Sequence, residues 1–276
     1  VKPAGTPRGA VVVIQEIFGV NSHIRRVAEQ YAAEGYLAIA PAMFDRLQKG
    51  VDLGYDSAGM QAGIGLMMKA SNEGALADVN AAINAVAHAG RVGMVGYCWG
   101  GRVTYLSGCH TNIAAGVAYY GGSITQLLPE TPRCPMMFHF GEHDSHISPA
   151  DVEKIRQAFP QGTYHLYPAG HGFNCTDRAD FDPASARLAF ERSIEFLPRH
   201  IGEIKPPESS GVSNERMGKV AAVQGDGGVS NWSTARRENP PADRCGDDAL
   251  DRSFVAGAAL RPQYSSLVVK DGCSAI

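Results

Sequence analysis

The stretch Gly96-Tyr97-Cys98-Trp99-Gly100 decides the fold of this chain. The apolar run Val92–Val95 before it predicts a buried strand, and the residues Gly101–Leu106 predict the start of a helix. A nucleophile on a sharp turn between a strand and a helix has the pattern G-x-S-x-G, and here Cys98 takes the place of the serine. Glycine is expected on both sides because such a turn is strained and crowded. The stretch therefore predicts a thiol nucleophile on a strand–turn–helix unit.

Length and composition favour one large α/β domain, since the chain has 276 residues and 44% apolar content. A net charge of −3 predicts no nucleic-acid partner, and the lack of a run of eighteen apolar residues predicts no membrane span or membrane partner. No signal-peptide pattern precedes the first strand. The six cysteines form no C-x-x-C pair, and they are Cys98, Cys109, Cys134, Cys175, Cys245 and Cys273. We interpret them as free thiols in a reducing compartment, which favours a cytoplasmic location.

Strand-like and helix-like segments alternate along the chain, which predicts a doubly wound, mostly parallel sheet with helices on both faces. The segment from Asp45 to Lys69 is rich in glycine and poorly periodic, so we predict a loop with short helical pieces there. The predicted strands are 10–15, 36–41, 92–95, 114–119, 135–140 and 164–167, and the predicted helices include 21–34, 75–87, 150–159 and 183–197.

The composition changes after Ile204. Residues 206–276 are rich in Gly, Ser, Pro, Asp and Arg, and such a segment buries too little apolar surface to offset its ordering entropy. We therefore predict an α/β domain over residues 1–205 and a low-complexity tail over residues 206–276, either disordered or not native to the domain. Within that tail, Leu260 to Lys270 could form a short strand.

Two partners for the Cys98 thiol follow later strands. A catalytic thiol needs a base, and the base needs a group that orients it. Asp144 follows the strand predicted at 135–140, and His171 lies between two glycines after the next strand. Both belong to the edge where the carboxyl ends of parallel strands meet and ligands bind. Asp144 would hold one imidazole nitrogen while the other faces the sulfur, so we predict a catalytic triad of Cys98, Asp144 and His171.

Each member of this triad has a simpler interpretation. Cys98 alone is compatible with a small buried hydrophobic residue, Asp144 with a turn or cap residue before Pro149, and His171 with a hydrogen-bonded loop histidine. The three simpler interpretations weaken together, because all three residues fall at the ends of successive predicted strands.

The histidines near Asp144 are the candidates for a metal site. His139, His143 and His146 lack a second cluster of ligands at a suitable spacing, so we expect no metal and no cofactor. Cys109 and Cys134 are predicted to be structural.

The first predicted strand ends in Glu16 and Ile17, at the same edge of the sheet. A partly exposed loop carboxylate is the simpler interpretation of Glu16. The functional one places it in the pocket beside the nucleophile, with the backbone N–H of Ile17 facing the substrate carbonyl. The N–H of Trp99, the residue after the nucleophile, would then be the second donor of an oxyanion hole.

Several motifs taken together resemble the dienelactone hydrolase family of α/β-hydrolases. They run in the family's order from about Ala10 to Leu197 and are 15–21 (QEIFGVN), 96–101 (GYCWGG), 119–121 (YYG), 141–144 (GEHD) and 170–173 (GHGF). The resemblance implies the α/β-hydrolase fold and a triad of Cys98, His171 and Asp144. It also implies a resting state in which the thiol pairs with Glu16, from which substrate binding releases the thiolate toward His171. The implied activity is the opening of an enol lactone, dienelactone, to maleylacetate without a cofactor.

The chain departs from the family in its arginines. Family members that act on dienelactone hold its carboxylate with two arginines, one of them four residues after the catalytic histidine, where this chain has Cys175. The other lies after the second strand, but no arginine occurs from residue 47 to residue 75, and Arg46 and Arg178 are displaced from the expected positions. The family also usually begins with strands before Ala10 that we expect to be missing. The resemblance therefore predicts the reaction class and leaves the natural substrate open.

Three alternatives remain from the sequence. The first is a broader carboxylesterase or thioesterase with the same triad, and the second is a non-catalytic homologue used for binding. The third is a redox-sensing thiol protein, which needs a resolving cysteine such as Cys109 or Cys175 near Cys98. The expected partner is a small lactone or ester, and the expected assembly is a monomer or a small homo-oligomer.

Overall fold

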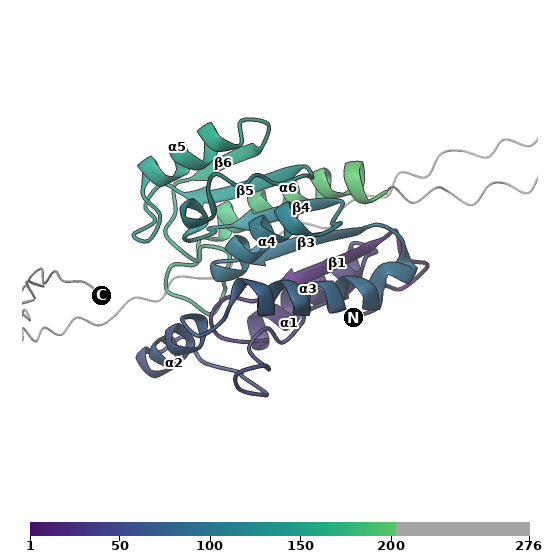
Figure 1. Ribbon diagram of the computed structural model, residues 1–276, viewed down its shortest axis with the longest axis horizontal. Coiled ribbons are helices and arrows are strands. Elements are labelled where there is room, and N and C mark those ends of the chain that lie inside the picture. Colours follow the sequence, from purple (N-terminus) through teal and green to yellow (C-terminus); the bar gives the residue numbers. More distant parts are fainter. Residues whose placement is uncertain (203–276) are drawn as a thin grey trace, which may run out of the picture. The chain divides into compact units, whose positions relative to one another are not determined.

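A six-stranded sheet forms the centre of the domain in a computed structural model that describes residues 1–202 (Figure 1). Every pair of neighbouring strands is parallel, in the order β2-β1-β3-β4-β5-β6, which confirms the predicted doubly wound sheet. The predicted boundary at residue 205, the tail 206–276 and the strand at 260–270 lie outside the described residues. The strands are β1 Ala10–Ile14, β2 Leu37–Ile39, β3 Val92–Tyr97, β4 Ala115–Tyr119, β5 Met136–Gly141 and β6 Thr163–Tyr167.

Helices cover both faces of the sheet, as the alternation of side chains along β1 shows. Val11 and Val13 belong to one apolar cluster with residues of α1 and α6, whereas Val12 and Ile14 belong to a second with residues of α3 and α4. A strand buried on both faces needs apolar residues at every position, which explains the unbroken run in this segment. The helices are α1 Ser22–Ala33, α2 Ser57–Met67, α3 Asn72–Val86, α4 Trp99–His110, α5 Pro149–Ala158 and α6 Pro183–Ile201, with short 3₁₀ turns η1 Ala87–Ala89 and η2 Ile124–Leu127. Within residues 1–202, none of these helices is both long and apolar enough to cross a membrane.

The prediction of a loop with short helical pieces is wrong over α2, which is one continuous helix of 11 residues. The side chain of Asp56 caps its first turn by accepting a hydrogen bond from the backbone N–H of Gly59 at 2.7 Å. Gly63 then faces the chain after β1, where an added Cβ would lie 2.3 Å from the carbonyl oxygen of Ile17. Glycine weakens a helix in isolation, but here it permits close packing that compensates. Tertiary contact therefore overrides the local signal.

After β2 is added on one side of β1, the next strand of the chain, β3, is added on the other side, so β1 marks the switch point of the sheet. At such a switch point the loops leaving the carboxyl ends of adjacent strands diverge and open a crevice. Glu16 leaves β1 and Cys98 leaves β3 at this point, so the topology brings these two segments together.

Candidate active site

Cys98 lies on the tight turn between β3 and α4, with φ of 54° and ψ of −118°. A positive φ is strained for a residue with a side chain, and such strain is typical of functional sites. The backbone N–H of Cys98 donates to the carbonyl of Tyr119 at 3.0 Å, which holds the turn against β4. An added Cβ at Gly96 would lie 2.0 Å from the Gly100 carbonyl oxygen, and one at Gly100 would lie 2.4 Å from the Gln15 carbonyl oxygen. Both glycines are required because backbone approaches them on the turn.

Asp144 and His171 form a buried pair, in which Nδ1 of His171 lies 2.8 Å from Oδ2 of Asp144. The other carboxylate oxygen accepts backbone N–H groups from His146 at 2.7 Å and Ile147 at 3.1 Å. These contacts fix the carboxylate, which in turn fixes the ring. Burial works against the charged form of Asp144, yet the hydrogen bonds from His171 and the two amides lower its pKa below the usual value.

The imidazole of His171 is electrostatically coupled to both Asp144 and Cys98. Burial disfavours the imidazolium, but the hydrogen bond to Asp144 and the neighbouring Cys98 thiol raise the pKa of His171 to about 10. The structure therefore brings together all three residues of the predicted triad, from the loops after β3, β5 and β6. At neutral pH this environment favours the imidazolium form of His171.

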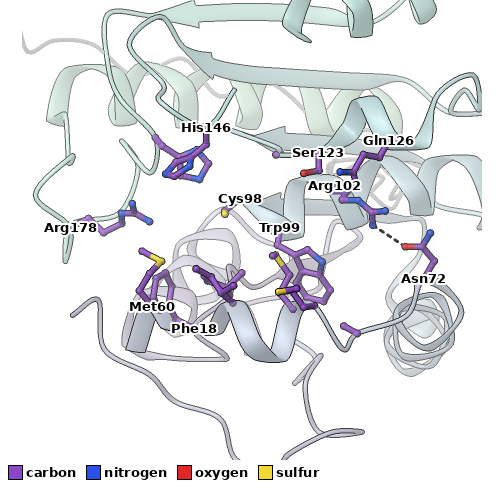
Figure 2. A pocket seen from close by; sticks show the side chains of 17 residues that line it. Phe18, Met60, Asn72, Cys98, Trp99, Arg102, Ser123, Gln126, His146 and Arg178 are labelled. Carbon is purple, nitrogen blue, oxygen red and sulfur yellow. Dashed lines mark hydrogen bonds between the residues drawn. The ribbon is translucent and has the colours of Figure 1, made fainter. Parts of the chain in front are cut away.

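A cavity of about 530 Å³ opens over the thiol at the carboxyl edge of the sheet (Figure 2). Cys98, which is partly exposed, and His171 both line it, as do Ile17 and Trp99. Trp99 is the first residue of α4, and the first N–H groups of a helix have no acceptor within it. The two amides predicted to form the oxyanion hole therefore belong to residues on the same cavity as the thiol.

Glu16 is buried beside this cavity with 1% of its surface exposed, so it is not the exposed loop carboxylate of the simpler interpretation. Its Oε2 accepts a hydrogen bond from the Tyr55 hydroxyl at 2.8 Å, and its Oε1 lies 3.9 Å from Nη1 of Arg178. In this arrangement the carboxylate bonds to the phenol and faces the guanidinium. Sequence reasoning missed Tyr55, because no local pattern indicates that a residue of the irregular segment before α2 reaches Glu16.

Two arginines line the cavity, and Figure 2 shows Cys98 between them. Arg178, displaced by three residues from the position of the family's arginine, points into the cavity with 11% of its side chain exposed. Arg102 lies in the first turns of α4 and donates to the Asn72 side chain at 2.9 Å. Sequence reasoning missed Arg102, although its place on the helix after the nucleophile was a usable signal. Arg46 pairs with Asp78 at 2.8 Å and is not among the lining residues.

The opposite wall of the cavity is apolar and comes largely from α2. Phe18 and Trp99 extend it toward the thiol (Figure 2). The residues of this wall from α2 and its end are Met60, Ile64, Met67 and Met68. Because methionine side chains are flexible and polarizable, this wall can adapt to apolar groups of different shape.

The remaining histidines and cysteines of the sequence analysis have other surroundings. His139 is fully buried in the sheet, where its ring nitrogens hydrogen-bond with the hydroxyls of Tyr167 at 2.8 Å and Ser193 at 3.0 Å. His146 lines the cavity and packs edge-on against the ring of His171, with 4.8 Å between the centroids. Burial raises the pKa of the Cys109 thiol to about 12, as expected for an inert, structural cysteine.

Comparison with known proteins identifies the family. Residues 1–201 match the description of the dienelactone hydrolase family. The chain belongs to this family. It is 37% identical over 214 residues to a Synechocystis protein provisionally named a carboxymethylenebutenolidase, a match that covers 69% of this chain and 86% of that protein. It is 32% identical over 206 residues to the carboxymethylenebutenolidase of Pseudomonas putida, covering 71% of this chain and 87% of the relative.

A solved structure from Klebsiella pneumoniae, provisionally named a dienelactone hydrolase, shares the fold with a TM-score of 0.64 at 30% identity. The match covers 72% of this chain and 91% of that one. The chain therefore has the α/β-hydrolase fold that the resemblance implied, and it is a hydrolase that acts on ester or lactone bonds of small molecules.

Proposed function

We propose that this protein is a cysteine-dependent hydrolase that opens enol lactones or esters through a thioester, with Cys98 as nucleophile, His171 as acid and base, and Asp144 as the residue that orients the imidazole. The observation that carries the proposal is the buried 2.8 Å pair of His171 and Asp144 beside a strained cysteine that lines the cavity. The family relationship supports the reaction class. The proposed catalytic domain is residues 1–205, and the free thiols favour a cytoplasmic location.

The proposed chemistry has two halves. The Cys98 thiolate attacks the carbonyl carbon, and the backbone amides of Ile17 and Trp99 stabilise the oxyanion. The imidazolium of His171 gives its proton to the leaving alkoxide or enolate, which completes the thioester. His171 then removes a proton from water, which attacks the thioester, and the acid leaves as the thiolate and imidazolium are restored. Cys98 also occupies the N-cap position of α4, at the positive end of the helix dipole.

Glu16 would gate the nucleophile in this scheme. The family resemblance implies a resting state in which the thiol pairs with this carboxylate, whereas here the carboxylate bonds to Tyr55 and faces Arg178. We therefore propose that the thiol alternates between Glu16 and His171, and that Tyr55 and Arg178 hold the carboxylate when the thiolate faces the histidine.

The residues that line the cavity favour substrates that carry both an anionic group and an apolar group. A carboxylate could pair with Arg178 in place of the arginine that Cys175 replaces, since a guanidinium binds carboxylates well. The methionine-rich wall favours a second candidate function, a broader carboxylesterase that accepts neutral apolar esters. Rates on a dienelactone, an aliphatic lactone and a series of p-nitrophenyl esters separate the two.

The test of the mechanism is the variant Cys98→Ala, assayed on the same substrates. We expect kcat/KM to fall by about 10⁴-fold or more, because members of a triad act as a unit. The matched control Cys109→Ser changes a buried thiol in the core and is expected to stay within about threefold of the parent, as a change away from the reacting atoms. Most of the activity surviving in Cys98→Ala would discard the mechanism.

A further inference from the structure

A second group of ligating side chains lies around Glu16. Glu16 after β1, His23 in the first turn of α1 and Cys175 on the loop after His171 each offer one ligand atom, and these atoms lie within 4.8 Å of one another. All three residues are buried, with exposed fractions of 1%, 3% and 0%. The proposed mechanism uses only the carboxylate, so the imidazole and the second thiol are unexplained.

Two atoms of this cluster have no hydrogen-bond partner. Nε2 of His23 and Oε1 of Glu16 are both buried without one among the described residues. Nearly all buried polar atoms in proteins have a partner, so two orphans on residues of one cluster point to a partner that the described residues do not supply. The nearest cation to Glu16 Oε1, Nη1 of Arg178, is 3.9 Å away, beyond hydrogen-bond distance.

We propose that Glu16, His23 and Cys175 bind a divalent zinc ion. A thiolate, an imidazole and a carboxylate are the ligand types that zinc takes in proteins, and the sulfur and nitrogen disfavour magnesium and calcium. Three protein ligands leave a coordination position for water, as is usual for zinc sites other than structural ones. The sequence predicts no metal, an expectation that rests on His139, His143 and His146, and none of these histidines belongs to this site.

A cysteine ligates zinc as its thiolate, so the thiol must lose its proton when the ion binds. Zinc uptake breaks the S–H bond of Cys175, forms a Zn–S bond and releases one proton to solvent, with no change in oxidation state. The carboxylate and thiolate then balance the charge of the ion.

A bound zinc ion would also hold the Glu16 carboxylate in place. Ligand atoms around zinc lie about 3.3–3.8 Å apart, given bond lengths of about 2.0–2.3 Å, so the side chains must close by about 1 Å. A carboxylate bound to zinc would no longer be available to the Cys98 thiol. That effect on hydrolysis rests on the proposed function, whereas binding itself does not, and the test below measures binding alone.

The test is a titration of the full chain carrying Cys98→Ala with Co²⁺, a spectroscopic substitute for zinc, so that the nucleophile cannot supply the thiolate. We expect a thiolate-to-cobalt charge-transfer band that saturates at one ion per chain, release of one proton per ion, and loss of the band on adding Zn²⁺. Adding Cys175→Ser should abolish the band, and His23→Gln should weaken Co²⁺ binding at least about tenfold, as loss of a ligand would.

The matched control is Cys134→Ser, which removes another partly buried thiol and should leave the band unchanged. Circular dichroism of each variant establishes that it is folded. The proposal is overturned if the Cys98→Ala protein shows no band, or if the band persists in folded Cys175→Ser and so comes from another thiol.

Discussion

The two walls of the cavity differ in how they are built. The wall that carries Cys98 and His171 consists of strand ends and short loops, and His171 and its partner Asp144 expose only 7% and 9% of their surface. The wall formed by α2 is open to solvent, and Ile64 and Met68 expose 39% and 78%. Chemistry requires fixed atoms, which buried strand ends provide. Recognition of varied apolar groups tolerates movement, so it can be left to an exposed helix with flexible side chains.

The largest expected effect is on the buried wall. Asp144→Asn removes the charge that favours the imidazolium, so we expect kcat to fall by about 10³–10⁴-fold, as in other triads. The pKa of His171 then falls from about 10, because only the neighbouring Cys98 still opposes the effect of burial. NMR titration of the imidazole in parent and variant measures this shift. An unchanged pKa would show that Asp144 does not set the charge of the ring.

The next test compares one glycine from each wall. Gly100→Ala places a Cβ 2.4 Å from the Gln15 carbonyl oxygen, so we expect a loss of about 3 kcal/mol in the free energy of unfolding. Gly65→Ala in α2 meets nothing within 4 Å and should be neutral or stabilise by up to about 1 kcal/mol, the difference in helix propensity. Urea denaturation measures both, and equal effects would contradict the contrast between a crowded and an open wall.

A smaller effect is expected at the arginine between the walls. Arg178→Gln should raise KM for a carboxylate-bearing ester by about 10–100-fold, as expected for loss of a charged hydrogen-bonding partner. Neutral esters of similar size should change by a much smaller factor. Arg46→Gln is the control, because Arg46 pairs with Asp78 and does not line the cavity. If KM rose by the same factor for both classes of ester, Arg178 would act through Glu16 and not through the substrate.

The smallest effect is expected on α2. Met60→Ala should raise KM for esters with a long apolar chain by about 3–10-fold, in line with the modest selectivity of apolar pockets. Short-chain esters should react as with the parent. Leu47→Ala, an exposed apolar residue that does not line the cavity, is the control. A loss of kcat on short esters would show that α2 positions the reacting groups as well.

The same contrast explains what the sequence could predict. The strands carry unbroken apolar runs, and Cys98 lies between the glycines of its turn. Local patterns of this kind predict the sheet and place Asp144 and His171 at its edge. The helix α2 was missed because one of its glycines, Gly63, packs against the carbonyl of Ile17, which is distant in sequence.

Contacts between side chains from separate segments were equally beyond a local pattern. Tyr55 reaches Glu16 across 39 positions of sequence, and His23 and Cys175 meet beside the same carboxylate only in the folded chain. Arg178 lines the cavity from a position three residues beyond that of the family's arginine, so a comparison by position alone did not indicate its contact with Glu16.

The most direct test of the central claim is to find the atom that carries the acyl group. A slowly hydrolysed p-nitrophenyl ester is mixed with the protein, the reaction is stopped in acid, and the intact mass and the peptides are measured. We predict one acyl group per chain, attached to Cys98 and absent from Cys98→Ala. An acyl group on another residue, or rapid turnover in Cys98→Ala, would contradict the account.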